Sequence, residues 1–356
     1  MNMTLNRLPS ITWYWLKMNN GCLEDVDPAG GPSMKDQVPQ HVSKSVLTMD
    51  SLPEQPTGMG KDMTSLITES KAQVQAYISD RDTEAKDPVM LNYDYKSGER
   101  TAGAVFLKAE RGSVMTVVED YSSPADADGF AALQTRYVVE KGATLKLIQI
   151  QRLGTGYTFL DDIGGRVEDQ GRVELIHLVL DGGPTYLGVQ SALAGYASSL
   201  KADIGYRVKG EGTLDINYFA NHTGRKTTCD IDAKGVLRDH AKKVFRGTID
   251  LKKGSSGSVG NEKEDVLMMD DTVRNQTLPV ILCTEEDVVG NHGATIGRLD
   301  ENTLFYLESR GMDKESVYEM MADARVASVV HLIGDKDVRG NVENYLSQGL
   351  NRDLAE

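Results

Sequence analysis

The chain has 356 residues, with 39 Lys and Arg against 53 Asp and Glu, so its formal net charge is −14 at neutral pH. This acidity argues against a nucleic-acid-binding module and against an anionic membrane surface as the main partner, because both need clustered basic side chains. With 40% hydrophobic and 26% charged residues, the composition is that of an ordinary soluble protein rather than a disordered chain.

Apolar runs and cysteines narrow the class of protein further. No run reaches the roughly 18 apolar residues that a membrane helix needs, so we expect no membrane span. Cys22, Cys229 and Cys283 are odd in number and far apart, which predicts no disulfide framework and a cytoplasmic location. Three thiolates are too few for an all-cysteine iron–sulfur cluster. We expect Cys229 and Cys283 to pack in the core, and Cys22 to be exposed.

Residues 1–88 form the first predicted region, an arm followed by a helix. Proline and glycine recur through residues 1–60 and predict an extended arm or a mobile loop. From residue 63 to residue 78 apolar side chains recur at helical spacing, which predicts one amphipathic helix.

Residues 89–300 have the texture of short strands. Segments such as 144–150, 173–180 and 213–219 alternate apolar and polar side chains, are rich in β-branched residues and follow a glycine. Helical periods between them are missing, so a doubly wound α/β fold is disfavoured, and a sandwich, a barrel or a β-solenoid remain. In a solenoid the polar members of the strands would face outward, among them Lys146, Glu174, Asp215 and Asn217.

Residues 301–356 are predicted to be a C-terminal helical region. Gly311 is placed to end a first short helix, and Asp313 to begin a second one with apolar positions three and four apart. Residues 338–350 predict a further helix. Met320 and Met321 of the second helix could seal the end of a solenoid.

Several catalytic patterns are missing from the sequence. Gly60-Lys61 lacks the remainder of a phosphate-binding loop, so no ATP site is predicted. Residues 254–260 are glycine-rich but miss the dinucleotide pattern and predict a turn between strands. No serine lies in a GxSxG elbow. His177 is expected to point outward from its strand in a structural role.

His292 is the main candidate for chemistry. It lies in residues 287–297 (DVVGNHGATIG), between Gly290 and Gly293, where the backbone can approach closely and present the imidazole. A neutral imidazole is a competent ligand for iron and other transition metals. Glycine and asparagine also favour loops, so a plain turn histidine is the competing interpretation.

Four ordered motifs resemble the SufB/SufD family of iron–sulfur cluster assembly proteins, and its SufD branch most. They are residues 241–249 (AKKVFRGTI), 274–279 (RNQTLP), 287–300 (DVVGNHGATIGRLD) and 304–311 (LFYLESRG). Residues 12–17 (TWYWLK) also resemble the opening of the family. The middle of the chain agrees in texture more than in motif.

The resemblance implies a fold and a role. The fold would be mainly β, a right-handed parallel β-helix with helical elements at both ends. The chain would be a non-catalytic scaffold that pairs with a SufB-like chain, binds a SufC-like ATPase through its C-terminal region and passes a transient iron–sulfur cluster to apoprotein acceptors. His292 would be the metal ligand at the SufB interface, and Tyr306, Arg310 and Gly311 would lie near the ATPase.

Two positions bear on the branch of the family. SufB-type chains carry a reactive cysteine where this chain has Val273, and an acidic motif where it has 291–295 (NHGAT), so both differences point to the SufD branch. One departure concerns Gly290, because SufD proteins often have a cysteine there. Without that thiol, His292 would have to act with ligands from the partner chain.

Two alternatives stay open at this stage. One is a β-helix enzyme acting on carbohydrate, which would need two carboxylates facing each other on adjacent turns. Asp161 and Asp162 are the only adjacent acidic pair near a plausible turn of the coil, and a solvated turn explains them better. The other is a SufB/SufD-like scaffold that pairs with a second copy of itself.

Overall fold

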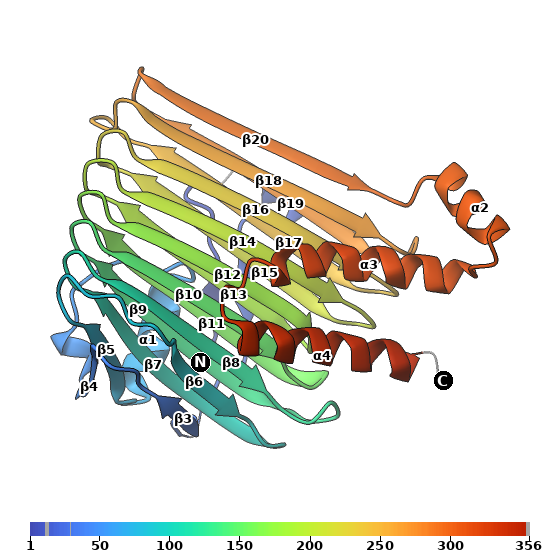
Figure 1. Cartoon of the computed structure of the whole chain (residues 1–356), viewed down its shortest axis with the longest axis horizontal. Helices are drawn as coiled ribbons and strands as arrows, with labels where there is room; N and C mark the ends of the chain where they lie inside the picture. The colour runs from blue at the N-terminus through green and yellow to red at the C-terminus, as the bar shows by residue number, and fades with distance from the viewer. Residues whose placement is uncertain (11–13, 29, 354–356) are drawn as a thin grey trace.

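The computed structural model describes residues 1–10, 14–28 and 30–353. Its strands fall alternately into two nine-stranded sheets, so the chain winds as a coil between them (Figure 1). We call the sheets even and odd after their strand numbers; β3 and β4, at the N-terminal edges, join the even and the odd sheet respectively. From β5 onward all pairing within the two sheets is parallel except with these two strands.

The strand bounds follow the sheet order. The even sheet contains β20 (Val288–Gly297), β18 (Ser258–Met268), β16 (Thr228–Leu237), β14 (Ser199–Val208), β12 (Arg172–Asp181), β10 (Thr144–Arg152), β8 (Val114–Ser122), β6 (Val89–Asp94) and β3 (Met34–Gln37). The odd sheet contains β19 (Arg274–Cys283), β17 (Lys242–Leu251), β15 (Thr213–His222), β13 (Thr185–Leu193), β11 (Gly156–Val167), β9 (Asp128–Val139), β7 (Glu99–Ala109), β5 (Val74–Ser79) and β4 (Val42–Leu47). A separate hairpin pairs β1 (Met3–Leu5) with β2 (Gly21–Leu23).

The winding has a regular period. Strands β12, β14, β16, β18 and β20 begin at residues 172, 199, 228, 258 and 288, so successive turns take 27, 29, 30 and 30 residues. One turn therefore comprises two strands, one in each sheet. The predicted mainly β solenoid is confirmed, and the sandwich and the barrel are excluded; the right hand of the coil stays a prediction.

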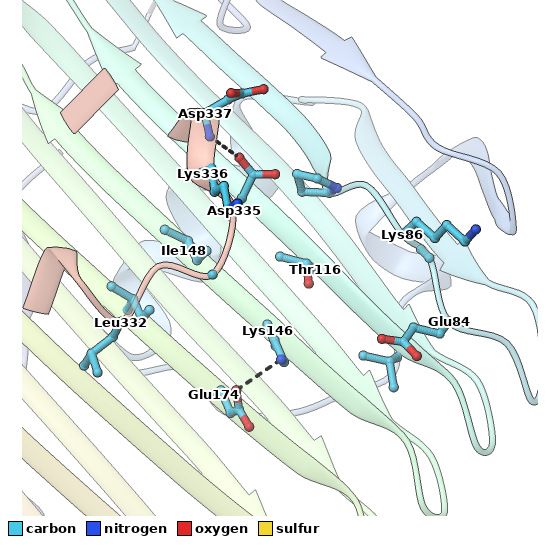
Figure 2. A pocket seen from close by; sticks show the side chains of 15 residues that line it. Glu84, Lys86, Thr116, Lys146, Ile148, Glu174, Leu332, Asp335, Lys336 and Asp337 are labelled. Carbon is cyan, nitrogen blue, oxygen red and sulfur yellow. Dashed lines mark hydrogen bonds and ion pairs between the residues drawn. The ribbon is translucent and has the colours of Figure 1, made fainter. Parts of the chain in front are cut away.

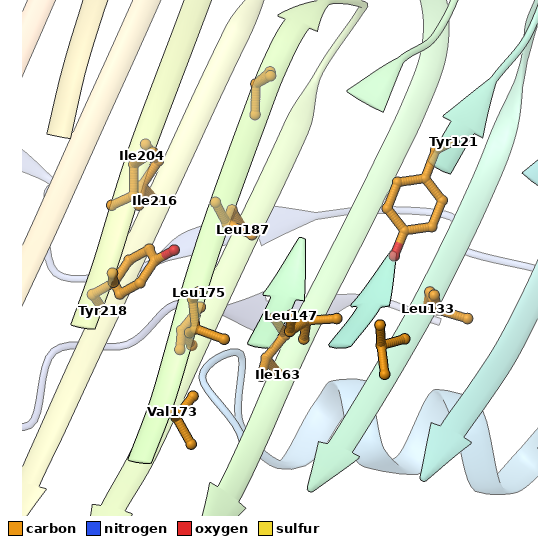
Figure 3. Packing of buried hydrophobic residues seen from close by; sticks show 14 of the residues in the cluster. Tyr121, Leu133, Leu147, Ile163, Val173, Leu175, Leu187, Ile204, Ile216 and Tyr218 are labelled. Carbon is orange, nitrogen blue, oxygen red and sulfur yellow. The ribbon is translucent and has the colours of Figure 1, made fainter. Parts of the chain in front are cut away.

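The interior between the sheets is filled by alternate side chains of every turn. Leu147, Ile163, Leu187 and Tyr218 lie within one buried cluster that runs along the coil (Figure 3). Aromatic rings occupy space that glycine leaves free: the ring of Tyr137 lies where a Cβ at residue 165 would be, and glycine is therefore required there.

Much of the N-terminal segment lies against the odd sheet as an extended arm, one of the two forms expected for residues 1–60. The backbone amide of Met59 donates to Asp162 Oδ1 at 2.8 Å, and Asn217 Nδ2 donates to the Gly58 carbonyl at 2.8 Å. Asp215 and Asn217 do face outward from the coil, but this segment covers them, leaving 8% and 2% exposed. The motif at residues 12–17 lies partly outside the described residues.

The helix predicted over residues 63–78 is shorter than expected. Helix α1 spans Lys61–Glu69 and buries the predicted apolar side chains Met63, Leu66 and Ile67. Lys71 then adopts a positive φ of 52°, which ends the helical path, and β5 begins at Val74. Val74 is buried because it belongs to a strand that pairs with β4 and β7, not to the helix.

The predicted helical tail is confirmed. Its helices are α2 (Glu301–Ser309), α3 (Lys314–Val330) and α4 (Lys336–Asp353). Gly311 has a φ of 93° after α2, and Asp313 caps α3 by accepting from the Ser316 amide at 2.7 Å. In the described part of the chain, no helix is long and apolar enough to cross a membrane.

Helix α3 covers a face of the coil rather than its end. It packs across β12, β14 and β16 of the even sheet (Figure 1). Met321 contacts the buried group of Val236, Leu267 and Met269, whereas Met320 is 42% exposed. The expectation that these methionines seal the solenoid is therefore wrong, and the C-terminal end of the coil stays open.

Candidate functional site

Strands β19 and β20 form the open end of the coil. Each is the last strand of its sheet, and within the described residues no strand pairs with their outer edges. Residues 288–297 form β20, paired in parallel with β18 over its whole length, so the competing interpretation of a plain turn histidine is wrong. Val289 and Ile296 of β20 are 49% and 42% exposed. Long edges with free backbone groups are templates for pairing with another chain.

The strand register sets the direction of His292. It pairs with Glu262 of β18, and paired residues in a parallel ladder point to the same face. Glu262 is an interior side chain, because a Cβ on Gly247 of the facing strand β17 would overlap its carboxylate. His292 therefore points along the interior face of the coil, and it is exposed because no further turn covers it.

Gly290 lies on the same face as His292. A Cβ at this position would lie 3.1 Å from Ile281 Cγ2 of the facing strand β19. A side chain at residue 290 would therefore press against Ile281, which would have to shift by a few tenths of an ångström.

A buried ion pair with additional hydrogen-bond partners lies in the turn next to the open end. Lys243 and Glu264 are each 1% exposed and form an ion pair with each other. Glu264 also accepts from Thr277 Oγ1 at 2.6 Å and from the Tyr206 hydroxyl at 3.1 Å. Burial lowers the pKa of Lys243, while the charge of Glu264 acts against that shift.

Glu262, two residues away on the same face, is not satisfied in this way. It is 5% exposed, and its Oε2 has no hydrogen-bond partner. Burial and, secondarily, the nearby charge of Glu264 raise the pKa of Glu262 to about 8. No motif in the sequence singles out Glu262. The signal was present in the alternation of β18, whose interior positions include Gly260, Glu262, Glu264 and Val266.

The cysteines are distributed differently from the prediction. Cys229 is buried and Cys22 exposed, as expected, but Cys283 is exposed. Cys283 pairs in register with the interior residue Leu251, so its direction was right, yet it ends the last odd strand and nothing covers it. Among residues 1–10, 14–28 and 30–353, no three His, Cys, Asp or Glu side chains are grouped to hold a metal ion.

The residues expected near an ATPase lie on α2. This helix projects beyond the strand ends and buries none of its side chains (Figure 1). Phe305 and Tyr306 are 73% and 55% exposed, and the Arg310 guanidinium lies 5.2 Å from the centre of the Tyr306 ring. They form a surface separate from the interior-facing side chains of β20.

The middle of the coil holds a second polar group that the sequence analysis misjudged. His177 does not point outward: it is 2% exposed and contacts Tyr218 and Gln149 in the interior. Asp161 is likewise no solvated turn residue but a buried strand residue that accepts from Gln149 at 3.0 Å. Burial raises the pKa of Asp161 and lowers that of His177 to about 3. A substrate as large as a sugar has no access to these groups.

A groove of about 570 Å³ lies between the start of α4 and the outer face of the even sheet (Figure 2). Lys146 and Glu174 face it as an exposed ion pair of 3.8 Å, in agreement with their predicted direction. The groove crosses β8, β10 and β12, whereas His292 lies on β20 at the far edge of the same sheet. It is not part of the open end.

The fold and this open end define a parallel β-solenoid with a histidine presented at its last turn. Residues 93–325 match the family model described as "SUF system FeS cluster assembly, SufBD core domain". The chain therefore belongs to the SufB/SufD family of the SUF system for iron–sulfur cluster assembly.

Curated relatives agree with this assignment. The "Iron-sulfur cluster assembly protein SufD" of Bacillus subtilis is 25% identical over 75% of this chain and 62% of its own length. The protein of the same name from Escherichia coli is 26% identical over 80% of this chain and 69% of its own length. A SufBD family protein of Mycobacterium bovis is 35% identical over 28% of this chain and 12% of its own length. The chain thus spans less than two thirds of the B. subtilis and M. bovis relatives.

Proposed function

We propose that the chain is a non-catalytic scaffold subunit of an iron–sulfur cluster assembly complex. The observation that carries the proposal is the open end, where an uncharged edge strand presents His292 on the interior face of the coil. Cytoplasmic residence accompanies this role, since all three cysteines are free thiols. The cluster is a transient cargo destined for apoprotein acceptors, and the ATP site belongs to another chain.

The open end pairs with a SufB-like chain. Strand addition to β19 and β20 would satisfy their free backbone groups and cover the exposed side chains Val289 and Ile296. Anaerobic co-expression with SufB-like and SufC-like chains tests this pairing by co-purification and mass. A stable chain that binds neither partner contradicts the proposal, and a dimer of this chain alone replaces it with the self-paired scaffold.

His292 supplies one ligand to the nascent cluster at that interface. An imidazole is a borderline ligand suited to iron, and a SufB-like partner would contribute the thiolate. We expect His292→Ala to keep the fold and the partners but to lower the cluster yield of the complex. His331→Ala is the control, because His331 is also exposed but lies at the end of α3. An unchanged yield in His292→Ala removes the ligand role and leaves the scaffold role intact.

Helix α2 with Gly311 binds the SufC-like ATPase. Its exposed Phe305, Tyr306 and Arg310 form an apolar and cationic surface of the kind enriched in protein interfaces. We expect Tyr306→Ala with Arg310→Ala to weaken ATPase binding. Tyr196 and Lys226 offer the matched control, since they form a similar cation–ring pair in a distant turn. Equal binding by both double variants places the dock elsewhere.

The carbohydrate enzyme is not favoured. Its required facing carboxylates would have to be accessible, and Asp161 and Asp162 are 4% and 0% exposed.

A further inference from the structure

The last complete turn of the coil contains one buried carboxylate that its own surroundings do not use. Glu262 and Glu264 are interior residues of the same strand, yet only Glu264 is satisfied, by Lys243, Thr277 and Tyr206. The ammonium of Lys243 is thus already engaged, and it donates to Thr277 as well, at 3.3 Å. Glu262 Oε2 lies buried with no partner, an arrangement that costs free energy unless a cation or a donor completes it.

The strand register fixes the neighbours of Glu262. Its partner in the preceding turn is Ile231 of β16, and across the interior its carboxylate lies against Gly247 of β17, where there is no side chain. Above it lies His292, its register partner on β20, in the adjacent strand about 4.8 Å away. Both side chains point to the same interior face. Glu262 and His292 are therefore adjacent residues of one interior column at the open end of the coil.

We infer that Glu262 is a second ligand, beside His292, for a ferrous ion held at the open end of the coil. This inference rests on the proposed function, in which iron is cargo. An imidazole and a carboxylate are a ligand pair suited to iron(II), and two ligands leave positions free for donors from a partner chain. A cation shared with His292 would give Glu262 Oε2 the partner that it lacks.

Cobalt(II) is a suitable spectroscopic probe for such a site in the full-length chain without partners. We expect the wild-type chain to bind one Co(II), with His292→Ala abolishing the visible band and Glu262→Gln weakening affinity at least about tenfold. Glu286→Gln is the matched control, because Glu286 is an exposed carboxylate in the turn just before β20. We expect it to bind like the wild type. Wild-type affinity in Glu262→Gln, or no Co(II) band in the wild-type chain, overturns the inference.

Thermal unfolding shows whether Glu262→Gln acts on metal binding or on the stability of the fold. Glu262→Gln preserves shape and removes a buried acid, so its unfolding midpoint without metal should be no lower than that of the wild type. Co(II) should then raise the midpoint of the wild type more than that of Glu262→Gln, because a ligand stabilises only the state that binds it. Equal increases contradict the inference. Failure of partner co-purification, by contrast, removes the proposed function and leaves the Co(II) result standing.

Discussion

The two ends of the coil protect their outer strands differently. At the N-terminal end β3 and β4 are four and six residues long and run antiparallel to their neighbours, and Lys44 of β4 pairs with Asp36 of β3 at 2.6 Å. At the C-terminal end β19 and β20 have ten residues each; β19 has one Arg at its start, and β20, VVGNHGATIG, has no Asp, Glu, Lys or Arg. Short, charged edges discourage strand addition and long, uncharged ones permit it. The coil therefore terminates at one end and can be continued at the other.

A charge placed on the open edge strand β20 should have the largest effect on the difference between the two ends. We expect Ile296→Asp to weaken binding of the SufB-like chain by about 100-fold or more, because an unpaired charge buried in an interface costs roughly 3–5 kcal/mol. Val46→Asp, on the edge strand β4, is the control, since Val46 is 52% exposed and Ile296 42%. Affinity of the complex is the measurement. Equal loss in both variants would mean that the two ends are alike.

Acid should distinguish the middle of the coil from its ends. Burial depresses the pKa of His177 from 6.5 to about 3, so the unfolded chain binds a proton in that window and the folded chain does not. Stability is therefore full above pH 6.5 and falls as the pH drops towards 3, by about 1.4 kcal/mol per pH unit for one proton.

The measurement is urea unfolding of the wild type and His177→Gln at several pH values. The variant should lack this slope. Asp161 and Glu119, whose pKa values burial raises, give a slope of opposite sign, and Asp161 Oδ2 lies 3.8 Å from His177 Nε2, so His177→Gln in an Asp161→Asn background is measured as well. Parallel pH profiles for wild type and His177→Gln would refute the assignment.

Glycine substitutions should report how tightly each region is packed. Gly165→Ala places a methyl group within the ring of Tyr137, and we expect the free energy of unfolding to fall by roughly 1–3 kcal/mol. Gly293→Ala on β20 meets no atom within 4 Å, so its effect should stay within about 0.5 kcal/mol. Chemical denaturation measures both. A large loss in Gly293→Ala would show that the last turn is packed like the middle.

The smallest effect is expected at the charged N-terminal edge. Lys44→Ala removes the ion pair with Asp36, whose side chains are 39% and 20% exposed. Partly exposed pairs contribute up to about 1 kcal/mol, so unfolding should change by no more than that. Asp36 keeps a hydrogen bond from the Tyr77 hydroxyl at 2.8 Å. A loss of several kcal/mol would assign this pair a structural role that its exposure does not predict.

Parts of the fold could be predicted from the sequence because they rest on local rules. Asp313 and Gly311 mark helix boundaries by capping, and period-two alternation marks strands wherever the interior positions are apolar. The coil period is harder to read from the sequence, because β18 and β19 begin at Ser258 and Arg274, well before their apolar stretches. Those earlier residues are polar although they belong to the strands.

The misjudged residues share a physical cause. His177, Asp161 and Glu262 are polar side chains at interior positions, where alternation alone assigns polar residues to the outside. Asp215 faces outward as predicted, but a segment distant in sequence covers it. Cys283 shows the reverse case, since its direction is interior but its turn is the last. Alternation gives the direction of a side chain only where apolar residues mark the interior positions, and burial depends on the turns and segments that cover it.

The last turn has a neighbouring turn on one side only, and this bears on its cooperativity. In a stacked architecture each turn is stabilised by its own contacts and by those of adjacent turns, so a terminal one opens locally at lower free energy than a central one. His292 and Glu262 therefore lie in turns of the coil whose local opening costs less free energy than that of the central turns. A partner subunit can change the conformation of the last turn without unfolding the other turns. The central turns keep their structure and hold the last turn in place.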